Sequence, residues 1–119
     1  MDPLSPRPWL NHVLKRHGLS APDGRPLYAY RIERDEFVEL RMILYGNPAE
    51  TSEHKALFCM YIAEWWRRNY NGGVWSWSDP LAALGIADDG YSRLYGAIQD
   101  GLRYWRRPLV TTRDARLFL

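Results

Sequence analysis

The sequence predicts an all-α fold, a single compact bundle of about five helices around one buried helix, and three observations lead to that prediction. Apolar residues recur at helical spacing in separate runs along the chain. Prolines open several of these runs and glycines close them, as at many helix ends. The run from Ala56 to Trp66 is apolar on nearly every side, which is typical of a helix at the centre of a domain. A length of 119 residues fits one domain, residues 1–119.

Two helices are predicted in the first part of the chain. The first covers Pro8–His17 and ends at Gly18, and its apolar face is formed by Leu10, Val13, Leu14 and His17. A loop with turn chemistry follows, and the alternating residues of Leu27–Ile32 favour a short extended segment. The second helix runs from about Glu33 to Tyr45. Its apolar stripe is formed by Phe37, Leu40 and Leu44, with Val38 and Ile43 beside it.

The central helix is predicted from Ser52 to about Asn69 or Tyr70, with Thr51 or Ser52 as its cap. Its expected core side chains are Leu57, Phe58, Tyr61 and Trp65. A short helix at 78–85 follows, and the last helix runs from about Gly90 to Arg106. We expect Leu94, Ile98 and Leu102 of this last helix to pack against the central one.

Two further features of the C-terminal part lead to predictions. Gly96 and Gly101 lower the helix propensity of the last helix, so we expect close approach of another helix at these positions. Pro108 ends the helical pattern, and residues 109–119 are either a short extended segment or the beginning of another element. Because the chain stops on three apolar residues, we expect either a docking tail or a domain cut from a longer protein.

Charge and composition exclude several classes of protein. The net charge is only +2, from 16 basic and 14 acidic residues, which is not the strongly basic balance of an obligatory DNA-binding protein. Nearly all the basic residues are arginine, either from genomic base composition or for binding phosphate and carboxylate groups. The single cysteine, Cys59, favours a reducing cytoplasm. No signal peptide or membrane-spanning run is recognisable, so we expect a soluble cytoplasmic protein.

No catalytic or metal-binding pattern stands out. Glu64 is the one charge in the buried run, and we expect Arg67 or Arg68 to pair with it one turn later. A paired structural glutamate is the expected role, because no second acid or base stands at a supporting spacing. The histidines and Cys59 have no metal-ligand spacing. We therefore expect a protein that is not an enzyme and that needs no metal and no cofactor.

Two similar aromatic and basic motifs are the best candidates for a binding surface. The stretches "WWRR" and "YWRRP" each place an aromatic pair and then an arginine pair at a helix end. They would form one basic aromatic patch if the two helix ends met, whereas cations at each helix end alone favour the helix dipole. Trp75 and Trp77 point the same way, either to cap the bundle or as an exposed pair. The candidate binding residues are Arg67, Arg68, Tyr70, Trp75, Trp77, Arg103, Arg106 and Arg107.

The stretches "LSAPDGRPLYAYRI", "ALFCMYIAEWWRRNYNGGVWSW" and "GLRYWRRPL" resemble the start of a family of large bacterial proteins. These are the non-helicase proteins of Druantia-type antiphage defence islands. The resemblance implies a cytoplasmic role in defence beside a large helicase, and it implies no catalytic residue here. The leading hypothesis is a non-enzymatic docking module that contacts a protein partner, with that helicase as the candidate. The alternative is a nucleic-acid-binding module that uses the aromatic and arginine helix ends for weak contacts.

Overall fold

The computed structural model describes residues 5–46, 50–69, 78–86 and 91–108, which form five α-helices and one 3₁₀ helix. In chain order these are α1 (Pro6–Arg16), η1 (Leu27–Tyr30), α2 (Arg34–Leu44), α3 (Ser52–Asn69), α4 (Ser78–Ala83) and α5 (Tyr91–Tyr104). No strand occurs within these ranges, so the all-α prediction is confirmed. The predicted extended segment at 109–119 lies outside the described residues.

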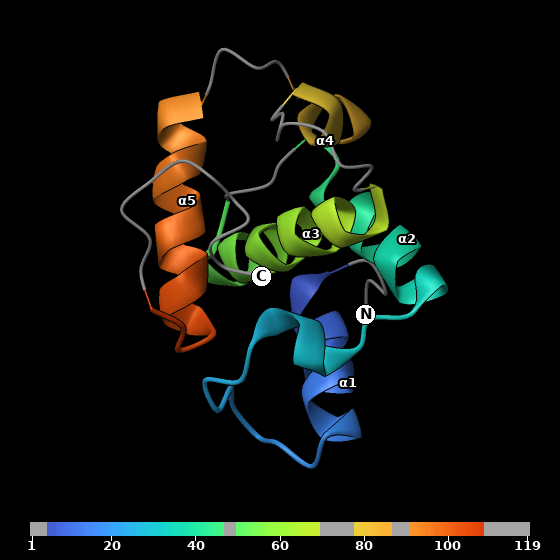
Figure 1. Ribbon diagram of the computed structural model, residues 1–119, viewed down its shortest axis with the longest axis vertical. Coiled ribbons are helices and arrows are strands. Elements are labelled where there is room, and N and C mark those ends of the chain that lie inside the picture. The colour runs from blue at the N-terminus through green and yellow to red at the C-terminus, as the bar shows by residue number, and fades with distance from the viewer. Residues whose placement is uncertain (1–4, 47–49, 70–77, 87–90, 109–119) are drawn as a thin grey trace.

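Helix α3 lies at the centre of the molecule, with α1, α2 and α5 packed around it (Figure 1). Every side chain from Ala56 to Ala63 is fully buried, as the apolar run predicted. One prediction needs correction: Trp65 is only partly buried, while its neighbour Trp66 is buried. When a helix is covered on nearly every side, the spacing of its apolar residues does not show which of two adjacent residues is more deeply buried.

Helix α5 crosses α3 in close contact at Gly101. A Cβ at this position would lie 2.5 Å from the backbone oxygen of Lys55 and 2.7 Å from the Cβ of Cys59, closer than side chains tolerate. Ile98 and Leu102 on either side of this glycine are buried, which confirms the predicted contact face, while the side chain of Leu94 lies outside the described part. Gly96 is different. It is exposed and has nothing within 4 Å, so the predicted close approach is wrong there.

The segment Leu27–Tyr30 is a 3₁₀ helix, which corrects the predicted extended conformation. Residues three apart share one face of a 3₁₀ helix, and both Leu27 and Tyr30 are fully buried. Pro26 precedes the turn and Arg31 ends it with a left-handed backbone, φ 54°. The residues whose alternation suggested a strand therefore form a short helical turn that ends at the left-handed Arg31.

The ends of the helices follow the expected punctuation with small shifts. Helix α1 begins at Pro6, two residues before the predicted start, and stops where Gly18 adopts a φ of +71°. The backbone N–H of Leu19 donates back to Leu14 across that turn at 2.9 Å. Of the two residues predicted as the cap of α3, Thr51 has the capping contact. Its Oγ1 accepts a hydrogen bond from the backbone N–H of His54 at 3.2 Å.

Among the described helices, none combines the length and the apolar character that a membrane crossing requires.

Candidate functional site

The structure describes five of the eight predicted binding residues. Tyr70, Trp75 and Trp77 lie outside the described residues, so the alternatives for the tryptophan pair stay open. Arg67 and Arg68 stand in the last turn of α3. Arg103, Arg106 and Arg107 stand at the end of α5 and just beyond it.

Arg67 and Arg68 are held by the fold. Both guanidinium groups bind the buried carboxylate of Glu64: Arg67 Nη2 donates to Oε1, and Arg68 Nε donates to Oε2 at 3.1 Å. The predicted pairing of Glu64 is therefore confirmed. Arg68 Nη2 also donates to the carbonyl oxygen of Ile32 at 2.8 Å, and its guanidinium lies 5.2 Å from the centre of the Phe37 ring. A phosphate would have to compete with these contacts.

The arginines of α5 are bound less tightly. Arg107 Nη1 donates to the carbonyl oxygen of Gly24 at 2.9 Å. Arg103 Nη1 donates to Asp100 one turn earlier at 2.8 Å, and the Arg103 side chain is 61% exposed. Arg106 is exposed and has a left-handed backbone, φ 59°.

The two arginine-pair helix ends do not meet, which corrects the hypothesis of one combined patch. Trp105 donates its indole N–H to the backbone oxygen of Ala56 at 2.8 Å, so the end of α5 lies beside the first half of α3. Arg67 follows Ala56 by eleven residues, about 16 Å along the helix axis. Figure 1 shows the end of α5 beside the beginning of α3, whereas Arg67 stands in the last turn of α3. Each arginine pair therefore makes contacts at its own helix end.

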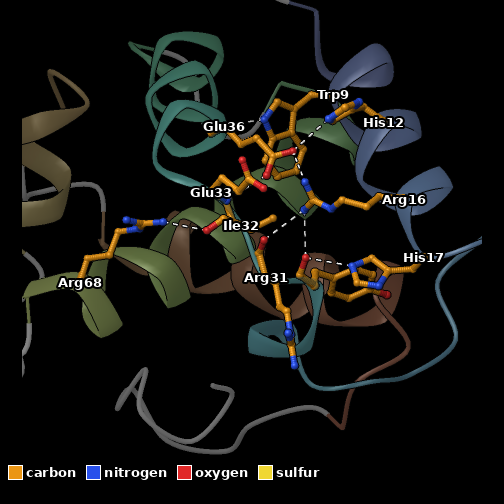
Figure 2. Close-up of polar contacts among 10 residues, drawn as sticks. Trp9, His12, Arg16, His17, Arg31, Ile32, Glu33, Glu36 and Arg68 are labelled. Carbon is orange, nitrogen blue, oxygen red and sulfur yellow. Dashed lines mark hydrogen bonds and ion pairs between the residues drawn. The ribbon is translucent and has the colours of Figure 1, made fainter.

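A second charged cluster, which we call the Glu36 cluster, joins α1 to α2 (Figure 2). Glu36 Oε2 accepts from Arg16 Nη1 at 2.5 Å and lies 3.1 Å from His12 Nε2. Glu36 Oε1 accepts from the backbone N–H of Glu33 at 2.9 Å, which forms half of a capping box at the start of α2. The indole N–H of Trp9 donates to the Glu36 backbone oxygen at 3.0 Å.

Arg16 and Arg68 bind the end of η1 and the two residues after it from opposite sides. Arg16 Nη2 donates to the carbonyl oxygens of Tyr30 and Arg31 at 3.0 and 3.2 Å, and Arg68 donates to that of Ile32 from the opposite side (Figure 2). Burial raises the pKa of Glu36, but the hydrogen bond from Arg16 and that from the Glu33 backbone outweigh burial and lower the pKa overall. The charged groups of Arg16, Glu36 and Arg68 connect this segment to the helices, so their role is structural.

The outer side of α2 presents a different surface. Val38, Met42 and Tyr45 recur at i, i+4 and i+7 and are 43%, 51% and 65% exposed. Arg34 and Arg41 flank this apolar stripe on one edge, and Asp35 and Glu39 flank it on the other, all four exposed. We call these seven residues the α2 face. An open hollow of about 370 Å³ adjoins it, lined by Arg41, Met42, Tyr45 and Ala83.

Tyr45 is fixed in place although most of its surface is exposed. The ring lies against Gly85, where an added Cβ would stand 2.8 Å from the ring carbon Cζ. Gly85 also has a φ of +70°, so both its backbone and the nearby ring favour glycine. Next to Tyr45, the backbone N–H of Gly46 donates to the Leu84 oxygen at 2.8 Å, which ties the end of α2 to the end of α4. An anchor that is ordered before binding loses little entropy when a partner arrives.

The charged side chains of the α2 face form no ion pairs within the described residues. Within the described ranges, no ion pair involves Arg34, Asp35, Glu39 or Arg41. By contrast, the inner side of the same helix carries the paired Glu36. An apolar stripe with unpaired charges on both edges is the composition of a protein-binding surface.

Sequence reasoning placed Val38 beside the core stripe and gave no role to Met42 or Tyr45. The signal was present, because helix α2 carries apolar residues on two opposite sides and only one side can face the core. The Glu36 cluster was also missed, although Glu33 and Glu36 have the spacing of a capping box. Neither pattern shows which other residues contact α2, because those residues lie far away in sequence.

The fold and these surfaces define a small all-α domain, and in the described residues no group of three or more His, Cys, Asp or Glu side chains is placed to hold a metal ion. The chain belongs to the YjiT N-terminal domain family, whose model matches residues 3–119. It is similar to Protein YjiT of Escherichia coli (strain K12), with 32% identity over 108 residues. That match covers 85% of this chain but 20% of the relative, so the chain spans about a fifth of that curated protein. No solved structure matches the chain.

Proposed function

We propose that this chain is a non-enzymatic docking module that joins another protein through the α2 face. The observation that supports this function is the exposed apolar stripe of Val38, Met42 and Tyr45, between charged edges that have no ion-pair partner in the described fold. Exposed apolar side chains at the centre and charges at the rim are the usual anatomy of a protein interface. Tyr45 and Arg41 are of the residue types that most often supply binding energy.

The alternative, a nucleic-acid-binding module, has less support. Arg67 and Arg68 are engaged with Glu64 and with a backbone carbonyl, so a phosphate would have to displace contacts inside the fold. Their side chains are 26% and 33% exposed, whereas a phosphate-binding surface needs accessible cations. Among the described residues of the predicted set, Arg103 and Arg106 are exposed and do not bind Glu64, whereas Arg68 is exposed but bound to it.

For the setting of this docking function we propose a bacterial antiphage defence assembly in the cytoplasm. The proposal is supported by the resemblance of the aromatic-glycine middle of the chain to proteins of Druantia-type islands. A large helicase encoded beside the gene is the first partner to test. The curated relative is about five times longer than the matched region, which leaves ample chain for other activities of such a protein.

A capture experiment tests the docking function. The wild-type chain is immobilised and offered the neighbouring helicase, beside a Met42→Glu/Tyr45→Glu variant and a Tyr28→Glu control. Tyr28 is 55% exposed but lies on η1, away from the α2 face, so the control carries a similar change elsewhere. We expect capture by the wild type and the control and loss of capture by the double variant.

A salt titration of DNA binding runs in parallel. Phosphate contacts release counterions, so affinity carried by arginines falls steeply as salt rises, with a slope of about −0.9 per contact on duplex DNA. Tight DNA binding with a steep salt dependence, and no helicase capture, would favour the nucleic-acid function and contradict the docking function.

A further inference from the structure

We propose that the protein seated on the α2 face is a second copy of this chain, with its α2 parallel to the first. The inference rests on the proposed docking function: the α2 face pairs with a second copy while no other protein is bound, and a helicase partner would compete with that copy for the same surface. It comes from the opposite charges of the two edges, which make the α2 face complementary to itself in one arrangement only.

The two edges are separated by the geometry of the helix. Arg34 and Arg41 are seven residues apart, about two turns, so they lie one above the other along one edge. Asp35 and Glu39 are four residues apart and line the other edge. The apolar stripe runs between them and separates the basic edge from the acidic edge along most of α2.

Two copies of such a face can be paired by a two-fold axis in two ways. If the axis runs along the helices, the helices are parallel and each basic edge faces the acidic edge of the second copy. If the axis runs across the helices, they are antiparallel and like charges face each other. Closed two-fold pairing is the commonest symmetry of protein assemblies. Since like charges oppose binding, the charge pattern selects the parallel pair.

The heights of the charges along the helix also match in the parallel pair. Arg34 stands one residue from the level of Asp35 of the second copy, which is about 1.5 Å along the axis. Arg41 stands two residues from the level of Glu39 of the second copy, about 3 Å. Both offsets are within the reach of an arginine side chain, so the symmetric pair brings four arginines to four carboxylates.

The hollow beside α2 gives the stripe of the second copy a place to pack. Met42 lies on the acidic side of the stripe, so in the parallel pair it faces the basic side of the other copy, where Arg41 and Tyr45 line the hollow. Methionine is flexible and fills irregular spaces well. Tyr45 is already held against Gly85 and offers a rigid wall.

The size of the face sets the expected strength. Three apolar side chains and one helix edge on each side make a small contact, of the kind found in transient complexes. We therefore expect reversible self-association in the micromolar to millimolar range rather than a permanent dimer.

Sedimentation of charge-reversed chains tests the pairing. The wild type should rise from 14.0 kDa toward twice that mass as its concentration increases. An Arg34→Glu/Arg41→Glu chain and an Asp35→Arg/Glu39→Arg chain each bring like charges together at both edges. Each alone should associate at least about tenfold more weakly than the wild type. Mixed in equal amounts, they restore opposite charges at both edges, so the mixture should associate like the wild type.

Circular dichroism and the unfolding midpoint of each variant show that it is folded. The pairing is overturned if the folded wild type stays at 14.0 kDa throughout, if both variants associate as it does, or if their mixture is no stronger than either alone. A wild type that stays monomeric but loses helicase capture on Met42→Glu/Tyr45→Glu would leave the docking function standing and overturn the pairing. Restoration by the mixture without any helicase capture would support the pairing and leave the helicase as the wrong partner.

Discussion

The two sides of α2 use the same kinds of residue for different purposes. Glu36, on the inner side, is buried and bound by Arg16 and by a backbone N–H of the capping box. Glu39, three residues later on the outer side, is exposed and has no ion-pair partner among the described residues. A buried charge must be paired to be tolerated, and its partners then fix the fold. An exposed, unpaired charge costs the fold nothing and remains available to another molecule.

The largest difference is expected for Glu36→Ala compared with Glu39→Ala. Removing the Glu36 carboxylate leaves Arg16 without its main partner and the N–H of Glu33 without its cap, so the free energy of unfolding should fall by about 2–4 kcal/mol. Glu39→Ala should change it by less than about 0.5 kcal/mol, as most surface changes do. Urea unfolding measures both. Equal losses of unfolding free energy in the two variants would show that burial and pairing do not make the inner side of α2 more important for stability than the outer side.

A second contrast uses two glycines of α5. Gly101→Ala puts a Cβ against the backbone and the Cβ of α3, which cannot move independently, so we expect a loss of about 1–3 kcal/mol in unfolding free energy. Gly96→Ala meets nothing within 4 Å and should stabilise the helix by about 0.5–1 kcal/mol. Thermal unfolding of the two variants gives the signs. A stable Gly101→Ala chain would contradict the close crossing of α3 and α5.

The pH dependence of stability tests the pairing on the inner side of α2. The pKa of Glu36 is lowered from its ordinary value of 4.5 in the folded chain, so its contribution is present above about pH 4.5 and is lost as the pH falls through the folded pKa. Glu36→Gln should therefore flatten the fall of unfolding free energy between about pH 5 and pH 3. The measurement is urea unfolding at a series of pH values. An identical slope in wild type and Glu36→Gln would exclude this linkage.

The smallest effect on stability is expected at Met42. Met42→Glu adds a charge to a half-exposed position on α2, so the unfolding free energy should change by less than about 0.5 kcal/mol. Any loss of docking in this variant is then a property of the surface. A loss of several kcal/mol would mean that Met42 belongs to the core.

Periodicity predicted the helices and the core well. The buried run of α3 follows from a local pattern, because apolar spacing acts within one element. The glycines of α5 predicted the helix crossing only in part, since it occurs at Gly101 and not at Gly96. The 3₁₀ turn at Leu27–Tyr30 was mistaken for an extended segment, since a period of three is hard to tell from a period of two over four residues.

The candidate surface was less predictable. The sequence predicted that Arg67 or Arg68 pairs with Glu64, but not that both arginines do so, nor that Arg68 also donates to the carbonyl oxygen of Ile32. Ile32 is 36 residues from Arg68, and no local pattern reveals such a contact. The α2 face was overlooked because the sequence of a helix with two apolar sides does not show which side packs against the core.

Oxidative cross-linking through Val38 tests the central claim most directly. In the parallel pair Val38 lies on the midline of the stripe and meets the same residue of the second copy, so Val38→Cys chains should form a covalent dimer when oxidised. Cys59 is buried, which raises the pKa of its thiol, and it should not compete. Tyr28→Cys is the control, because Tyr28 lies on η1 and is 55% exposed, against 43% for Val38. Rapid dimer formation by Val38→Cys alone is the expected result. Equal, slow cross-linking of both chains would contradict a docking face on α2 that pairs with itself.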